Sequence, residues 1–284
     1  MKNYHAVSLT ALAGGAVAFV LRLAQNRTGF EADTGLPLPG NCFAVLLPVF
    51  LAALALALFL LTRRLPGERE DTPLPFTGYF SARNTAALSL MVAGVFLWGL
   101  SGLGDIVFAR IRPHLDADML LFAITPRMYI LLGVLTALSA GTLYVLLCTC
   151  RGGKRASKNP PLSGNLLLVP AGCLLIRLVL VYREDSVNPS LTVYYVEILA
   201  LSLLILALYR ASSFAFHCGR TRRFALYAAC ALVMCIATLA DGHALPSTML
   251  YLGGAALMLG LLLMRAEGEQ KTPETSAGQP DGGV

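Results

Sequence analysis

The chain has 284 residues, of which 56% are apolar and 13% are charged, and its mean hydropathy is +0.68. Soluble domains carry about 25% charged residues, and a core of this size cannot hide so much apolar surface from water. The composition therefore excludes a soluble globular protein and predicts an integral membrane protein. The net charge of +6 does not indicate nucleic-acid binding, because the basic residues form short clusters between apolar runs rather than one patch.

Eight apolar runs are long enough, or nearly so, to cross a bilayer, which takes about 20 residues of helix. They cover residues 6–25, 42–62, 85–107, 128–150, 164–182, 190–209, 224–241 and 247–264. Prolines in the spacers separate several of them. The sequence therefore predicts an all-α, polytopic transmembrane bundle that forms one domain over residues 1–265. The polar tail, residues 266–284, has the composition of a disordered cytoplasmic segment.

The first run allows two interpretations. Lys2, an apolar stretch and small residues together resemble a secretory signal peptide, and its removal would leave seven spans. The apolar stretch, residues 6–21, is long for a signal peptide, and Arg22 and Gln25 follow it without a suitable cleavage site. We therefore expect this run to be retained as the first span.

The distribution of lysine and arginine predicts the orientation. Connections on one side of the eight spans, with both termini, carry fifteen basic residues, and those on the other side carry five. Cytoplasmic loops are the basic ones, so both termini are expected in the cytoplasm and the protein in the plasma membrane. The basic loops near residues 151–158 and 210–223 could also attract anionic lipid head groups. The simpler interpretation is that these charges only fix orientation.

The two halves of the chain are loosely similar. An arginine lies at the outer end of the first span of each half, Arg22 and Arg177, and an aspartate at the outer end of the third, Asp105 and Asp241. Four spans is an even number, so the halves would be parallel copies, an arrangement known among transporters. The alternative is chance, because runs rich in Leu, Ala and Gly match one another easily.

Two ionisable residues lie inside spans, where a charge costs about 2.5–3.5 kcal/mol on insertion scales and needs a partner or a wet cavity. At 1.5 Å per residue, Arg177 is about 8 Å and Glu197 about 10 Å below the outer ends of the fifth and sixth spans. A short loop joins these spans, so we predict an Arg177–Glu197 ion pair. It serves either helix packing or a binding site.

Several polar residues nearer the outer boundary complete the candidate site. Arg22, Asp105 and Asp241 lie nearer the outer boundary, and Tyr194 lies within one turn outside Glu197. With the Arg177–Glu197 pair they would line a polar vestibule open to the outside. The alternative for Asp105 and Asp241 is that they simply end their helices and face water.

Motifs for catalysis or cofactor binding do not appear in a fitting context: there is no P-loop, dinucleotide fingerprint, HExxH, CxxC or GxSxG. The four histidines are scattered, and most of the seven cysteines lie in apolar runs or basic loops, where cysteine usually acts as a small hydrophobe. We therefore expect neither an enzyme nor a cofactor or metal site.

Two functions remain open on the sequence. The first is a small-solute permease or transporter-like protein with an outward-facing polar vestibule. The second is a non-transporting membrane sensor, scaffold or accessory subunit of a membrane complex. The expected partners are the lipid bilayer and either an unidentified small solute or another membrane protein.

Overall fold

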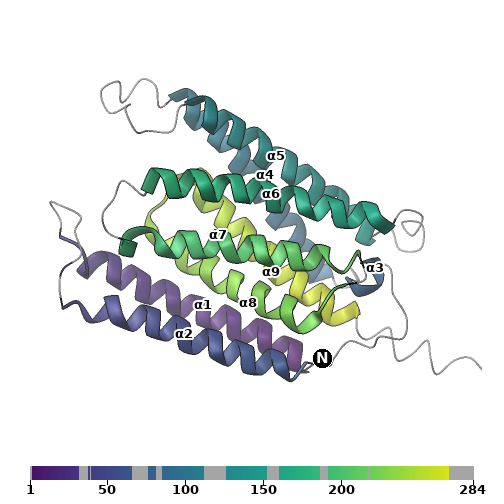
Figure 1. Ribbon diagram of the computed structural model, residues 1–284, viewed down its shortest axis with the longest axis horizontal. Coiled ribbons are helices and arrows are strands. Elements are labelled where there is room, and N and C mark those ends of the chain that lie inside the picture. Colours follow the sequence, from purple (N-terminus) through teal and green to yellow (C-terminus); the bar gives the residue numbers. More distant parts are fainter. Residues whose placement is uncertain are drawn as a thin grey trace, which may run out of the picture.

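A computed structural model describes residues 2–31, 38, 40–65, 76–80, 85–111, 126–151, 160–185, 191–216 and 218–268. Over these residues the chain forms nine α-helices and one short 3₁₀ helix (Figure 1). They are α1 (Lys2–Thr28), α2 (Cys42–Arg63), α3 (Phe76–Tyr79), α4 (Thr85–Ile111), α5 (Pro126–Arg151), α6 (Pro160–Asp185), α7 (Leu191–Ser212), α8 (Thr221–Thr238), η3 (Leu239–Asp241) and α9 (Leu245–Gly268).

Eight of these helices, all except the four-residue α3, are long and apolar enough to cross a membrane. Each coincides with one of the eight predicted runs, so the predicted helical membrane bundle is confirmed. Most helix ends differ from the predicted runs by one to four residues, and two of these differences bear on the predictions. The helix α4 continues four residues beyond 107, and α9 includes residues 266–268, which were assigned to the tail. The rest of the predicted tail lies outside the described residues.

The helix α8 lies at the centre of one side of the bundle, where it packs against α1, α7 and α9. The helix α9 in turn lies along α4, and α4 lies along α5 (Figure 1). Among the described helices, α2 packs mainly against α1 and α8. It exposes apolar side chains along its length. That outward face suits hydrocarbon rather than water, as expected for a membrane span.

Glycine pairs allow α4 to approach both of its partners closely. A Cβ added to Gly94 would lie 2.9 Å from the carbonyl oxygen of Gly253 on α9. A Cβ added to Gly102 would lie 2.7 Å from the carbonyl oxygen of Gly133 on α5. Small residues at such crossings let the backbones touch, which is the main source of helix packing in lipid.

The helix contacts do not follow a two-fold relation between the halves. If the chain consists of two halves of four spans each, α8 is the counterpart of α4, and α9 is the counterpart of α5. Over the described residues, α4 lies along α9, whereas no comparable contact joins α8 to α5. The four-plus-four repeat therefore stays a prediction from the sequence.

An aromatic cluster lies at the end of the bundle where α1 begins and α9 finishes. Figure 1 shows the short helix α3 at this end. The short helix α3 brings its rings against residues beside the α7–α8 connection, with ring centroids 4.8–5.8 Å apart. The aromatic cluster consists of Phe76, Tyr79, Phe80, Phe214 and Phe224. Such stacked and edge-to-face rings exclude water from this end.

Candidate functional site

Polar side chains gather at the opposite end of the bundle, where α1, α4 and α6 finish and α7 and α9 begin. Arg22, Asp105, Arg177 and Glu197 are all buried there, with 1–7% of their surface exposed. The side chain of Asp241 is 7% exposed. All six candidate residues from the sequence thus lie at this end of the bundle, since Tyr194 is in the first turn of α7, and the five charged ones each have a polar partner.

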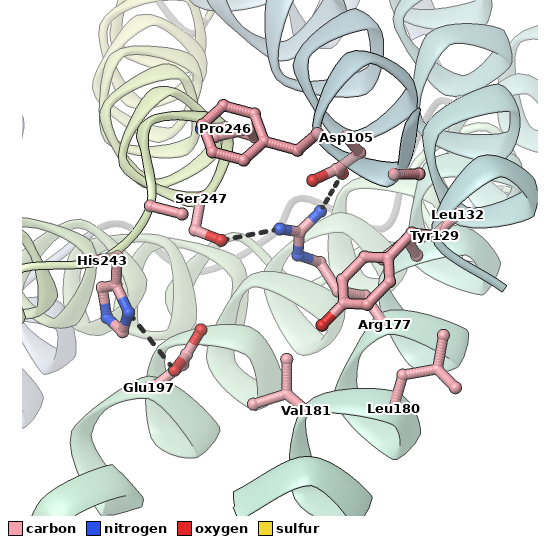
Figure 2. Close-up of a pocket in the computed structure, with 13 residues that line it drawn as sticks. Asp105, Tyr129, Leu132, Arg177, Leu180, Val181, Glu197, His243, Pro246 and Ser247 are labelled. Carbon is pink, nitrogen blue, oxygen red and sulfur yellow. Dashed lines mark hydrogen bonds and ion pairs between the residues drawn. The ribbon is translucent and has the colours of Figure 1, made fainter. Parts of the chain in front are cut away.

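Arg177 connects three helices. From α6 its Nη1 donates to Asp105 Oδ2 of α4 at 2.8 Å, and its Nη2 donates to Ser247 Oγ of α9 at 3.0 Å (Figure 2). The predicted Arg177–Glu197 ion pair is therefore wrong. The helices α6 and α7 are neighbours, as predicted, but Arg177 points from α6 towards α4 and α9 rather than towards α7.

Glu197 has its own partners near the beginning of α7. Its Oε1 accepts a hydrogen bond of 2.5 Å from the hydroxyl of Tyr251 on α9. Its Oε2 lies 3.7 Å from Nδ1 of His243 (Figure 2). This second distance is too long for a hydrogen bond. One carboxylate oxygen is therefore hydrogen-bonded, while the other has only an electrostatic neighbour.

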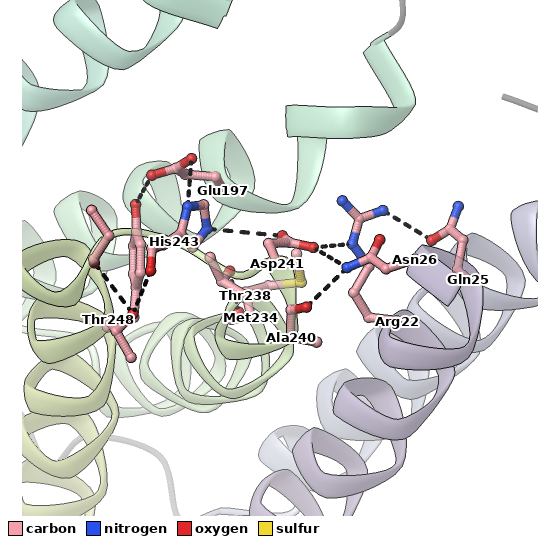
Figure 3. A network of polar contacts seen from close by, with 12 residues as sticks. Arg22, Gln25, Asn26, Glu197, Met234, Thr238, Ala240, Asp241, His243 and Thr248 are labelled. Atoms are coloured by element: carbon pink, nitrogen blue, oxygen red, sulfur yellow. Dashed lines mark hydrogen bonds and ion pairs between the residues drawn. The ribbon is translucent and has the colours of Figure 1, made fainter. Parts of the chain in front are cut away.

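Arg22 is the second buried arginine at this end. Its Nε donates to Asp241 Oδ1 at 2.5 Å, and its Nη1 donates to Gln25 Oε1 at 2.9 Å. Asn26 of the same helix also donates to Asp241 Oδ1, at 2.9 Å (Figure 3). The helix α1 thus presents three polar side chains to the turn that follows α8.

The interpretation of Asp105 and Asp241 as water-facing helix ends is wrong. Asp105 lies inside α4, because that helix runs on to Ile111, and it is buried against Arg177. Asp241 ends the 3₁₀ helix η3 but is covered by α1. Gly242 follows with a φ of +63°, a left-handed conformation that glycine adopts without strain. The chain can therefore turn sharply between η3 and α9.

That turn places His243 between two carboxylates. Its Nδ1 lies 3.7 Å from Glu197 Oε2, and its Nε2 lies 4.0 Å from Asp241 Oδ2 (Figure 3). Asp241 Oδ2 and His243 Nε2 are both buried without a hydrogen-bond partner among the described residues. The result is a chain of polar groups that runs from α1 through the turn to α7 and α9.

Tyr194, the sixth candidate, is half-buried and does not line the cavity at this end. The next residue, Tyr195, takes a place in the site instead, with its ring centroid 5.5 Å from the guanidinium carbon of Arg22. One step along a helix turns a side chain by about 100°, so the two adjacent tyrosines face different neighbours.

The two ion pairs both cross between the halves of the chain. Arg22 of the first half binds Asp241 of the second, and Arg177 of the second half binds Asp105 of the first. Each pair joins the first span of one half to the end of the third span of the other. The sequence pattern of Arg and Asp in both halves therefore corresponds to two reciprocal contacts, although the surrounding helices pack differently.

A cavity of about 210 Å³ opens between these helices. Since a water molecule takes about 30 Å³, the cavity has room for more than a single water molecule. One side carries charged and polar groups, and the other is apolar through Leu132, Leu180 and Val181 (Figure 2). Its polar and aromatic lining includes Asp105, Phe108, Tyr129, Arg177, Glu197, His243 and Ser247.

Tyr251, Ser247, Tyr129 and His243 are not among the six candidate residues named from the sequence. Tyr251 lies about 9 Å along α9 from Leu245 at 1.5 Å per residue, which is close to the depth expected for Glu197. A search for polar side chains at matching depth would have found it. Gln25 and Asn26 follow Arg22 by three and four residues, so helical spacing also places them on one face.

Within the described part of the chain, no group of three or more His, Cys, Asp or Glu side chains is placed to hold a metal ion. The chain matches no protein-family model, no curated protein and no solved structure. The protein is a multi-pass integral membrane protein on the strength of its eight apolar helices, and its more specific function rests on the site.

Proposed function

We propose that this protein is a small-solute permease whose solute binds in the cavity beside Arg177 and Glu197. The observation that carries the proposal is the placement of buried charged groups around a cavity at one end of a membrane domain. Burying ionisable groups in a membrane domain is costly, and such groups commonly mark solute or ion pathways. The apolar side of the cavity limits its contents to a solute with both polar and apolar parts.

The distribution of basic residues among the connections supports a cavity on the outer face. Fifteen lysines and arginines belong to connections at the end with the aromatic cluster, against five at the end with the cavity. Because cytoplasmic loops carry the excess of positive charge, this distribution supports an outward-facing site in the plasma membrane.

The aromatic cluster supports the same proposal from the other end. A transporter exposes its site to one side of the membrane at a time. The rings of Phe80, Phe214 and Phe224 pack edge to face where a solute would leave towards the cytoplasm. The cavity at one end and the packed rings at the other therefore support the proposal of a site that is open to the outside.

Filling the cavity tests the proposal. Val181 lines the cavity, whereas Val179 on the same helix is 60% exposed on the lipid-facing surface. We expect a panel of small polar solutes to include one that raises the unfolding temperature of the purified wild-type protein. At a concentration of 100 times its Kd, such a solute stabilises the folded state by about 2.7 kcal/mol. The Val181→Trp variant should lose this stabilisation, and Val179→Trp should keep it.

Uptake into proteoliposomes then completes the test. The solute that stabilises the wild type should accumulate in vesicles that contain wild type or Val179→Trp, but not in those that contain Val181→Trp. If no solute in the panel stabilises the wild type, or if both tryptophan variants behave alike, the cavity is not a solute site and the proposal is wrong.

A second candidate function is a non-transporting sensor. It is favoured by the two ion pairs that cross between the halves, since they fasten the cavity end on both sides. The same measurements separate the two functions. A sensor would bind a solute in the cavity, with the same loss in Val181→Trp, but vesicles containing the wild type would take up none of it.

A further inference from the structure

The charges around the cavity are not balanced. Each buried arginine at this end forms its close ion pair with an aspartate, Arg22 with Asp241 and Arg177 with Asp105. Both terminal nitrogens of Arg177 are occupied, one by Asp105 and the other by Ser247. Among the described residues that line the cavity, Glu197 is the second carboxylate beside Asp105, and its partner within hydrogen-bonding distance is the neutral hydroxyl of Tyr251.

Two kinds of cation can balance Glu197. The first is a proton on His243, whose Nδ1 lies 3.7 Å from Glu197 Oε2. The second is a positively charged solute in the cavity that Glu197 lines. An anionic solute finds no comparable site, because Arg177 is the one arginine among the described residues that line the cavity and Asp105 already neutralises it.

The rest of the cavity suits the apolar substituents of an organic ammonium ion. Phe108 and Tyr129 line it, and an aromatic face attracts a cation within about 6 Å of the ring centroid. Leu180 and Val181 supply an apolar surface on the other side (Figure 2). The cavity of about 210 Å³ is thus lined by a carboxylate, two aromatic residues and aliphatic side chains. This combination suits an alkylated ammonium group.

We infer that the cavity binds a small organic ammonium ion against Glu197, in competition with a proton on His243. The inference rests on the proposed function, since it names the solute class of the same cavity. Binding of the ammonium ion places a positive charge beside His243 and drives its proton into solution. Protonation of His243 in turn balances Glu197 and weakens binding of the ammonium ion. This exchange would couple solute binding to proton movement.

The groups that face His243 come from every element around it. Its direct neighbours are Glu197 of α7, Asp241 of η3 and Tyr251 of α9, whose ring centroid is 5.5 Å from that of His243. Further away stand Arg22 and Tyr195 beside Asp241, and Arg177, Asp105 and Tyr129 on the cavity lining. The arginines are paired with the aspartates, so the proton on His243 responds mainly to Glu197.

Three probes of matched shape and different charge test the solute class. They are choline, its neutral isostere 3,3-dimethylbutanol, and the anion 3,3-dimethylbutyrate, each titrated into the purified full-length protein by calorimetry. We expect choline to bind at least about tenfold more tightly than either of the other two, a difference of about 1.4 kcal/mol. Glu197→Gln keeps an oxygen that can accept from Tyr251 but removes the charge, and it should weaken choline binding at least tenfold. Val179→Trp, on the lipid-facing surface, should leave it unchanged.

The pH dependence of choline binding tests the competition with a proton on His243. Histidine is the side chain that ordinarily changes charge between about pH 5 and pH 8, and lowering the pH across this range should weaken choline binding by the wild type about tenfold or more. His243→Gln cannot take up the proton, so its Kd for choline should stay level over the same range. Titrations in two buffers of different ionisation enthalpy should detect proton release in the wild type and none in His243→Gln.

Failure of this inference is distinct from failure of the proposed function. Equal or tighter binding of the neutral or anionic probe would overturn the ammonium assignment, and so would absence of choline binding. If another solute then stabilises the wild type but not Val181→Trp, the proposed function still stands. Tight choline binding with a level pH profile in the wild type would overturn the exchange with His243.

Discussion

The two ends of the bundle bury arginine in different ways. At the cavity end, Arg22 and Arg177 each bind a buried aspartate. At the other end, Arg265 lies with its guanidinium carbon 5.5 Å from the ring centroids of both Tyr79 and Phe214. Its Nη2 donates to the hydroxyl of Thr221 at 2.7 Å. All three arginines are at most 7% exposed.

The difference lies in how the positive charge is balanced. A carboxylate neutralises the charge fully, and the pair is then stable in a region of low dielectric as long as both members remain. Aromatic faces and a hydroxyl do so only in part, typically by about 0.5–2 kcal/mol for a cation over a ring. The cavity end is therefore held by charge pairs between helices that are far apart in the sequence, and the other end by packed rings around Arg265.

The largest expected effect comes from breaking a pair at the cavity end. Arg177→Met leaves Asp105 buried without a counter-charge, and removing one partner of a buried pair costs about 3–5 kcal/mol. The double variant Arg177→Met with Asp105→Leu removes both charges, so it should recover most of this loss. Unfolding in mild detergent, followed for the two single variants and the double variant, measures the coupling energy.

The double variant also shows whether Arg177 and Asp105 stabilise the protein as one unit. Without Arg177 and Asp105 the cavity end loses the contact between α6 and α4, although Glu197 is unchanged. If the double variant is as unstable as the single ones, the pair does not act as a unit and the contrast between the two ends is wrong.

The sequence predicted the spans well because the bilayer sets their length, and apolar runs of that length have few alternatives. The burial of Arg177 and Glu197 followed in the same way from their positions within those runs. Their partners could not be predicted, because hydropathy does not determine how each helix is rotated about its own axis. Arg177 binds Asp105, 72 positions away in the sequence, rather than Glu197 on the adjacent helix.

The aromatic cluster was not predicted for a different reason. The helix α3 has four residues, Phe76–Tyr79, which is far shorter than the window of about 11 residues in which a helical periodicity can be recognised. Its rings matter only in combination with Phe214 and Phe224, which belong to another part of the chain. The signal in the sequence is a group of aromatic residues, Phe76, Tyr79 and Phe80, between the second and third predicted spans. In the sequence, this connection was interpreted only through its basic residues, which predict the orientation.

An intermediate effect is expected in the aromatic cluster. Phe214 is 1% exposed and contacts Tyr79, Phe80 and Phe224, so Phe214→Ala should cost about 3 kcal/mol, at the lower end of the range for buried phenylalanine. Phe216, two residues later, is 46% exposed, and Phe216→Ala should change stability by less than about 0.5 kcal/mol.

Both phenylalanine variants are measured by the same unfolding assay, in the presence and absence of a solute that stabilises the wild type. Stabilisation by the solute should persist in Phe214→Ala, because the cavity lies at the other end. Loss of that stabilisation would mean that the two ends are coupled and cannot be compared as separate regions.

The smallest effect is expected from removing, at each end, the hydroxyl that accepts a hydrogen bond from a buried arginine. Ser247 and Thr221 each accept from Nη2 of a buried arginine, Arg177 and Arg265 respectively. Thr221→Val should cost about 1.5 kcal/mol, since a hydrogen bond to a charged group is lost, and Thr221→Ser should cost less because the hydroxyl remains. Ser247→Ala should cost under about 1 kcal/mol, since Asp105 still balances Arg177 and water in the cavity can replace the hydroxyl. Equal costs at the two ends, measured by unfolding, would mean that the cavity does not supply water to Arg177, which would remove the physical basis for treating that end as the open one.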